Sequence, residues 1–289
     1  YADQLSARPG EALDIKVSSL SQQPYQASLV RVRYADPNPE GPGVKLENIP
    51  SSWEGTYPSR EQKFFPGSYG RVDSTGSLCR LEDFSALITL LPTRPGSGEQ
   101  TLICHQDSTS GWSLFLDDEG CLAAKLGKAG DTRKFRLEGS LRERKWYQAW
   151  LTYDAQTSKL TLGKEILDPG LKNEDQTGSS SDYAFESVSQ EIPFLIGAQF
   201  SGPIDSHFNG KLEEPKIFSR SLNQPEIEQA FSGKIPDGLL ARWDFSREIP
   251  TSRMIDLGPE NLEGSLVNCP ARGMTGSNWK GKEMCWRHA

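Results

Sequence analysis

The sequence has few cysteines and histidines and no basic cluster, and each shortage excludes a class of protein. Five cysteines stand far apart among 289 residues and form no CxxC pair, so neither a disulfide framework nor a structural zinc site is expected. The net charge is −7 and no run of five basic residues occurs, which argues against nucleic acid as a partner. No apolar stretch approaches the roughly 18 residues that cross a bilayer, so no membrane partner is expected.

The first residue is Tyr1 rather than Met, and no apolar segment of the kind found in secretion signals follows it. The chain is therefore expected to be a trimmed, processed or excised form. The odd number of widely spaced cysteines is interpreted as a set of reduced thiols, which persist in a reducing compartment. Together these observations predict a cytoplasmic location.

Signatures of catalysis are missing too. The nucleophile motif G-x-S-x-G and the glucanase triplet E-x-D-x-x-E are both absent, and Glu213 and Glu214 are neighbours that a strand would direct to opposite faces. The histidines His105, His207 and His288 lie far apart, and His105 is expected to be a hydrogen-bonded surface residue. No catalytic residue and no metal ligand is therefore assigned, and no cofactor is expected in this chain.

What the sequence does contain is a series of short segments that alternate between apolar and polar residues. Turn-forming glycine, aspartate and serine clusters separate Phe84–Pro92, Gly111–Gly127 and Trp146–Leu162. This spacing predicts an all-β fold, an antiparallel β-sandwich with one short helix. The helix is expected to begin near Asn223, which can cap it, and to end at Gly233.

Other segments complete this prediction. Glu11–Ser18 and Gln26–Tyr34 are expected to pair as strands, and the Pro- and Gly-rich run Asp36–Val44 to form a rigid loop. Gly76–Leu81 is expected to be a strand, and the polar stretch Asp168–Asp182 a mobile surface loop.

Aromatic residues supply the candidate contact sites. Trp112, Trp146, Trp150 and Trp243 fall on alternating patterns and are expected in the core. Other aromatic residues lie in loop-rich sequence or near the end of the chain, where they could contact a ligand or a partner: Trp53, Tyr57, Phe65, Tyr69, Trp279 and Trp286. Calcium remains open because loop acids could ligate it, although solvated turn acids are favoured for Asp107, Asp117, Asp118, Asp205 and Asn209, which lack the D-x-[DN]-x-[DN]-G pattern.

The order of the motifs resembles the laminin-G or concanavalin A-like jelly roll. The resemblance rests on Gly111-Trp112, on the run from Trp146 to Asp154 (WYQAWLTYD), and on Phe208 to Glu214 (FNGKLEE), followed by Leu222 and Glu226-Ile227. It implies a jelly-roll fold and says little about a ligand.

A narrower resemblance covers nearly the whole chain. Leu29–Gly43, Phe65–Val72 and Asn268–Gly281 resemble the N-terminal part of the large subunit of N,N-dimethylformamidase and its relatives. This implies a downstream catalytic part, with a mononuclear iron held by two tyrosines and a glutamate, that hydrolyses a formamide. None of those ligands maps onto this chain.

The resemblance implies a non-catalytic domain that supports or packs against a downstream catalytic domain and other subunits of an amide hydrolase. The alternative is a stand-alone lectin-like module that binds a glycan. Three parts are expected: N-terminal strands and a Pro/Gly-rich loop over 1–75 that complete or flank the sandwich, the jelly roll over 76–270, and a tail over 271–289 that leads to a downstream part.

Overall fold

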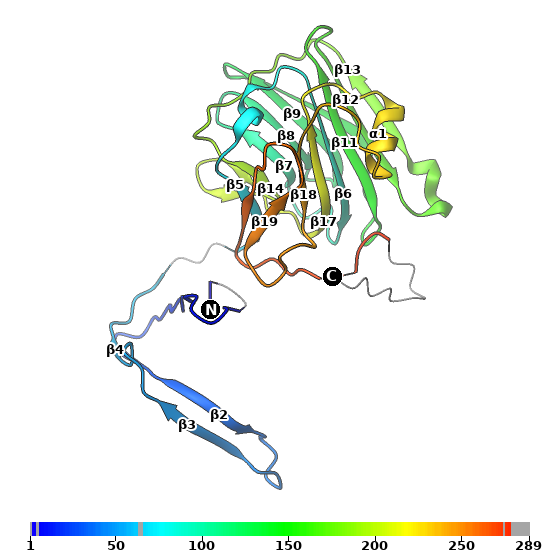
Figure 1. Cartoon of the computed structure of the whole chain (residues 1–289). Helices are drawn as coiled ribbons and strands as arrows, with labels where there is room; N and C mark the ends of the chain where they lie inside the picture. The colour runs from blue at the N-terminus through cyan, green and yellow to red at the C-terminus, as the bar shows by residue number, and fades with distance from the viewer. Residues whose placement is uncertain (1, 4–5, 63–65, 274, 279–289) are drawn as a thin grey trace. The chain divides into compact units, whose positions relative to one another are not determined.

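The computed structural model describes residues 2–3, 6–62, 66–273 and 275–278. The chain divides into two compact units (Figure 1). The N-terminal unit comprises Tyr1–Asp3 and Leu13–Pro66, and the sandwich unit comprises Gln4–Ala12 and Gly67–Ala289.

The N-terminal unit consists of two small antiparallel strand pairs. Its strands are β1 (Tyr25–Ala27), β2 (Leu29–Ala35), β3 (Val44–Ile49) and β4 (Gly55–Tyr57). Strand β1 pairs with β4, and β2 pairs with β3 across the predicted Pro- and Gly-rich loop. The expected strand over Glu11–Ser18 is wrong, because only Ile15 there forms an isolated bridge, to Ala2. Strand β2 pairs with β3 instead, so the segment 11–18 is left without a strand partner among the described residues.

The sandwich unit holds the remaining elements, and most of its strands come in antiparallel runs of chain neighbours. Its elements are β5 (Tyr69–Val72), η1 (Gly76–Arg80), β6 (Phe84–Pro92), β7 (Gln100–Gln106), β8 (Gly111–Leu116), β9 (Cys121–Lys128), β10 (Asp131–Ser140), β11 (Tyr147–Asp154), β12 (Lys159–Ile166), η2 (Pro169–Glu174), β13 (Gln176–Ser180), β14 (Phe194–Ile196), β15 (Gln199–Phe200), β16 (Ile204–Asp205), β17 (Gly210–Phe218), α1 (Gln224–Phe231), β18 (Leu239–Asp244), β19 (Arg253–Asp256) and β20 (Gly264–Val267).

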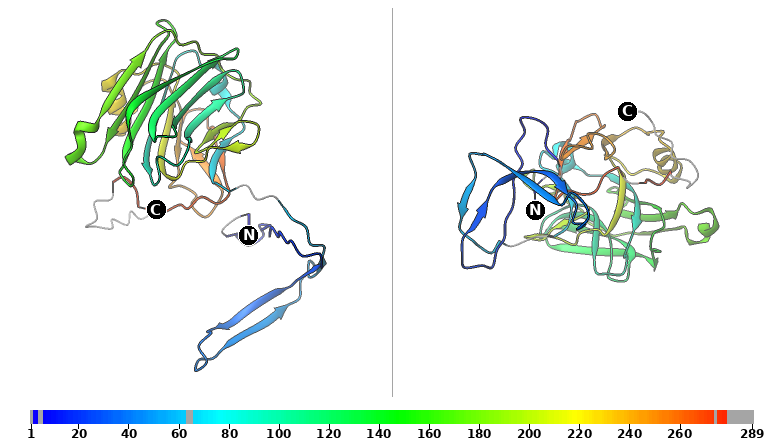
Figure 2. Two further views of the ribbon diagram at one scale, coloured as in Figure 1. Left: turned by 180° about the vertical axis from the view of Figure 1, so that it is seen from behind. Right: turned by 90° about the horizontal axis from the view of Figure 1, so that it is seen from below.

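The main sheet folds over on itself into two layers. One layer runs β10-β9-β8-β7-β14-β5-β20-β19, the other runs β18-β17-β6-β11-β12-β13, and a short β18–β19 pairing joins them (Figure 2). Aromatic rings from opposite layers meet in the core: Phe84 stacks on Trp112 with ring centroids 4.7 Å apart, and Phe194 stacks on Trp243 at 5.1 Å. The predicted antiparallel β-sandwich is confirmed.

Strand β6 shows how the alternating pattern produces the layer. Phe84, Ala86 and Ile88 belong to the core between the layers, whereas Leu87 belongs to a second apolar cluster. This is the two-sided burial expected for a central strand whose residues alternate between faces. Ser85 is also fully buried, and its hydroxyl donates to the Arg220 carbonyl at 2.8 Å, so the one polar side chain at this end is satisfied.

The predicted helix is confirmed as α1. The Asn223 side chain accepts from the Glu226 amide and the Glu226 carboxylate accepts from the Asn223 amide, which forms a capping box. Ile227 and Ala230 bury the inner face of the helix against Trp150, in the second cluster with Leu87. Helix α1 thus covers apolar side chains that lie outside the core between the two layers.

Three expectations for the sandwich unit are corrected. Gly76–Arg80 is a 3₁₀ helix rather than a strand, begun by Gly76 in a left-handed conformation. Asp168–Asp182 is not a loop throughout, because Gln176–Ser180 forms β13 along β12. Backbone pairing at a sheet edge needs no apolar side chain, so polarity alone did not reveal that strand. Trp146 is only half-buried, one position before β11, and Tyr147 takes the core position instead.

The last described residues are held along the sandwich by specific hydrogen bonds. The Asn268 side-chain amide donates to the Gly67 carbonyl at 2.8 Å, and the Lys211 ammonium donates to the Thr275 carbonyl at 2.9 Å. The Ser277 hydroxyl donates to the Glu213 carboxylate on β17 at 2.7 Å. The described residues after β20 are therefore bonded to this unit.

Candidate functional site

The predicted contact aromatics fall into different places. Trp53 and Tyr57 lie close together in the N-terminal unit, where the Tyr57 hydroxyl donates to the Trp53 carbonyl and the Tyr57 ring stacks on Tyr25 at 5.7 Å. Both side chains remain exposed. Tyr69 is half-buried in β5 of the sandwich unit, with its ring centroid 5.8 Å from that of His207. The other three candidates lie outside the described residues: Phe65, Trp279 and Trp286.

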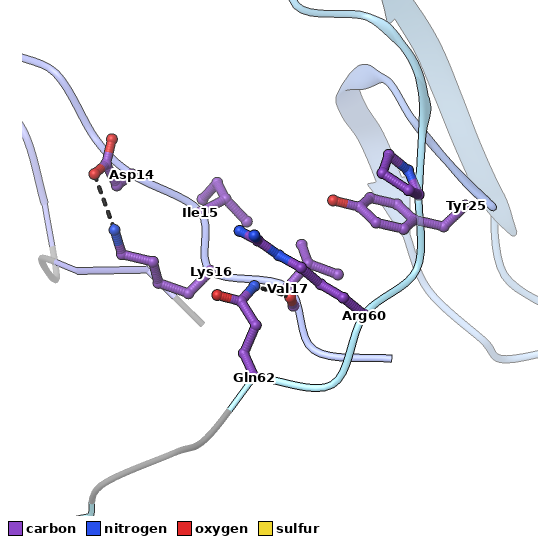
Figure 3. Close-up of a pocket in the computed structure, with 8 residues that line it drawn as sticks. Asp14, Ile15, Lys16, Val17, Tyr25, Arg60 and Gln62 are labelled. Atoms are coloured by element: carbon purple, nitrogen blue, oxygen red, sulfur yellow. Dashed lines mark hydrogen bonds and ion pairs between the residues drawn. The ribbon is translucent and has the colours of Figure 1, made fainter. Parts of the chain in front are cut away.

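A polar hollow of about 310 Å³ lies within the N-terminal unit, between the segments 14–17 and 58–62 (Figure 3). Lys16 donates to Asp14 at 3.0 Å within the first segment, and the Gln62 side chain donates to the Val17 carbonyl, which links the two segments. Arg60 extends across the hollow between the two segments. The residues that line the hollow include no nucleophilic side chain paired with a base.

The β2–β3 hairpin presents a continuous apolar surface. Residues opposite each other in the register share a face, and an extra residue at Arg33 shifts the pattern by a bulge. One face, here called the apolar face, therefore carries Val30, Val32, Ala35, Val44, Leu46 and Asn48. It contains no charged residue. Its four large aliphatic side chains are between 39% and 65% exposed.

The opposite side, here called the charged face, carries an ion-pair cluster. Glu47 lies 2.6 Å from the Arg33 guanidinium and 3.9 Å from that of Arg31, which is its partner in the register. Lys45 shares this face with them. Leu29, Tyr34 and Ile49 also lie on this face, so the hairpin has one face without charged residues and another that mixes charged and apolar side chains.

No described residue of the N-terminal unit is buried. Among the described residues, the exposed large apolar side chains of the sandwich unit are Ile249 and Leu257, and all the others belong to the N-terminal unit. Two-stranded hairpins are marginally stable on their own in water, and an exposed apolar patch of this kind marks an interaction surface. The alternation of Val30 with Val32 predicted a strand, but the sequence did not show that this strand lacks a covering layer.

Two candidate reactive groups of the sandwich unit, His105 and Cys104, are buried. His105 is 1% exposed rather than on the surface as expected, with Nε2 3.2 Å from the Ile192 carbonyl oxygen. Burial lowers the pKa of His105 to about 4. Burial also raises the pKa of the Cys104 thiol to about 12, so this thiol stays protonated and is a poor nucleophile.

Two of the loop acids, Asp107 and Asp117, accept hydrogen bonds within their own turns. Asp107 accepts from the Thr109 and Ser110 amides, and Asp117 accepts from the Cys121 amide at 2.9 Å. These bonds lower the pKa of both carboxyls although burial opposes them. No group of three or more His, Cys, Asp or Glu side chains within the described residues could hold a metal ion.

The adjacent glutamates of β17 have different partners. Glu213 accepts from Ser277, whereas Glu214, at a bulge with φ of 43°, lies 3.0 Å from the buried Lys216 ammonium and 2.9 Å from Arg242. Burial would raise the pKa of Glu214, but the Lys216 and Arg242 charges outweigh it and the pKa is lowered. The two acids are therefore not a catalytic pair. No helix among the described residues is long and apolar enough to cross a bilayer.

Comparison with known proteins identifies the class. The family model for the concanavalin A-like lectin/glucanases superfamily matches residues 66–228, and the chain belongs to that superfamily. A putative carbohydrate-binding protein from Bacteroides ovatus shares the fold, with a TM-score of 0.51 and 16% identity over 77% of this chain and 65% of that one.

The resemblance to dimethylformamidase is confirmed at the level of sequence similarity. The chain is 33% identical to the N,N-dimethylformamidase beta subunit of Paracoccus aminophilus and 30% identical to that of an Alcaligenes species. Both alignments cover 100% of this chain. The chain spans 41% of the length of each relative, so further polypeptide accompanies the matched part in both.

Proposed function

We propose that this chain is an accessory, non-catalytic domain of an N,N-dimethylformamidase-like amide hydrolase, in which it packs against the catalytic part and other subunits. The observation that carries the proposal is the N-terminal unit, which exposes most of its large apolar side chains among the described residues and buries none of them. A polypeptide with such a surface is suited to assembly.

On this proposal the catalytic residues belong to another part of the enzyme. The sandwich unit encloses His105 and Cys104, Asp107 and Asp117 accept hydrogen bonds within their own turns, and Glu214 is held in an ion pair. The resemblance implies an iron, which on this proposal is held in the downstream catalytic part. The name "beta subunit" carried by the relatives supports the presence of other subunits in the assembly.

Two measurements test this function. The purified chain, assayed with dimethylformamide and added iron, should show no hydrolysis above the buffer background. Deleting the matched part from the Paracoccus aminophilus subunit should reduce both its assembly, followed by sedimentation, and its activity. Hydrolysis by the chain alone, or full assembly and activity without the matched part, would refute the accessory role.

The alternative of a glycan-binding module has weaker support. Sugar sites commonly use exposed aromatic rings, and in the described part of the sandwich unit the exposed large apolar residues are the aliphatic Ile249 and Leu257. Trp53 and Tyr57 are exposed in the N-terminal unit instead. A glycan-array screen that gave a specific ligand, lost on Trp53→Ala, would favour this alternative.

A further inference from the structure

We infer that the apolar face of the β2–β3 hairpin docks on the part of the subunit that, in the relatives, lies outside the 41% matched by this chain. This inference rests on the proposed function and names the partner surface within it. The occupant is an uncharged aliphatic surface of that same polypeptide.

The first step is that the hairpin needs a cover. Among the described residues of the N-terminal unit, no third strand lies beside its two strands and no layer covers either face. Val32 and Leu46 are direct cross-strand partners at the middle of the apolar face and are 54% and 55% exposed. Each aliphatic side chain of this size contributes about 1.5–3 kcal/mol when it is fully buried, so the unsupported hairpin forgoes much of its stabilisation.

The second step concerns the direction of docking. On the charged face, Glu47 forms ion pairs with Arg31 and Arg33. Covering this face would remove water from these charges, which costs free energy. The apolar face bears no charge, and its polar member is Asn48 at one end. Covering the apolar face therefore leaves the ion pairs in solvent.

The third step identifies the occupant. Both alignments include the whole chain, so the hairpin accompanies the sandwich in the relatives. More than half of each relative's length lies outside the match, which supplies a large surface tethered at high effective concentration. A marginal hairpin requires a partner that is always present, and a tethered one meets that need better than a separate chain.

The test compares two settings for the same residues. A chimaera carries this chain in place of the matched part of the Paracoccus aminophilus beta subunit, and amide hydrogen exchange is measured over residues 29–49 in the chain and in the chimaera, without other subunits. We expect exchange in the hairpin to slow about tenfold or more in the chimaera. The double variant Val32→Glu/Leu46→Glu should abolish that slowing.

The matched control is Leu29→Glu, which makes the same kind of change on the charged face at a residue that is 42% exposed. It should keep most of the slowing. Because these side chains are exposed in the chain alone, both variants should leave the melting temperature of the sandwich unit unchanged there, which shows that they fold.

Several results would overturn the inference. Equal exchange in the two settings, equal effects of the two variants, or slowing that appears only when other subunits are added would each do so. Concentration-dependent dimerisation of the chain, abolished by Val32→Glu/Leu46→Glu, would assign the face to a second copy instead. The proposed function fails separately, if deleting the whole matched part leaves assembly and activity intact.

Discussion

Gly163 provides the sharpest test of the packing beneath α1. It lies opposite Trp150 in the β11–β12 register, and a Cβ built there would be 2.0 Å from Cζ2 and 2.1 Å from Cε2 of the indole. These atoms belong to a rigid ring that is 1% exposed and contacts Phe231 edge-on at 6.4 Å. The added methyl group therefore displaces the ring.

The expected cost of Gly163→Ala follows from three terms. Overpacking costs about 1–3 kcal/mol, and complete loss of the tryptophan would set an upper bound of about 3–5 kcal/mol. Replacing glycine returns about 0.4–1 kcal/mol through the unfolded chain. We expect a net loss of about 2 kcal/mol, which for a unit of this size lowers the melting temperature by about 4–8 °C.

The assay is denaturant unfolding of a double-mutant cycle with Trp150→Ala. Once the indole is removed, Gly163→Ala should cost close to nothing, so the coupling between the two sites should be about 2 kcal/mol. Gly96→Ala is the control, because the nearest atom to a Cβ there is 3.9 Å away, and it should leave stability unchanged within about 0.5 kcal/mol. Additive costs for Gly163 and Trp150 would refute the reasoning.

Three further predictions concern the sandwich unit. Burial lowers the pKa of His105 from 6.5 to about 4, so its contribution to stability is full above pH 6.5 and is lost as the pH falls toward 4. The wild type should lose about 2 kcal/mol more than His105→Gln between pH 7 and pH 5, in urea titrations. Asn223→Ala removes the cap of α1 and should cost about 1 kcal/mol by thermal unfolding, and a cost below the error of the measurement would contradict the capping role. Glu214→Gln should destabilise by about 1–2 kcal/mol because it weakens the ion pair of the buried Lys216. Lys216→Met should be nearly neutral, because it removes the buried charge together with the pair. If Lys216→Met costs more than Glu214→Gln, the ion pair is not what stabilises this bulge.

The all-β class and the helix could be predicted because their signals are local. Strand β6 alternates through Phe84, Ala86 and Ile88, and the capping residue Asn223 stands next to the residues it caps. Both signals act within a few residues along the chain, so no knowledge of distant contacts was required. The family resemblance depended on the same local runs in a fixed order.

Elements without a local signal were missed. Strand β13 is polar and forms because β12 offers a free edge, and the buried His105 packs beside Phe194 and contacts the Ile192 carbonyl, both of which are distant in the sequence. The candidate site shows that local signals are not sufficient. Aromatic character pointed to Trp53 and Tyr57, whereas the strand that contains Val30 and Val32 was expected to pair with the segment 11–18 and instead pairs with β3.

The periodicity of the chain was sufficient to specify strands, turns and a capped helix, because those depend on neighbouring residues. Which faces are covered depends on the partner that each face meets. Val30 and Leu87 both alternate with neighbours in a strand, yet Val30 is 39% exposed in a lone hairpin and Leu87 is fully buried beneath a helix. Burial requires two surfaces in contact. The local pattern of a strand specifies its apolar face, but it does not specify which other element covers that face.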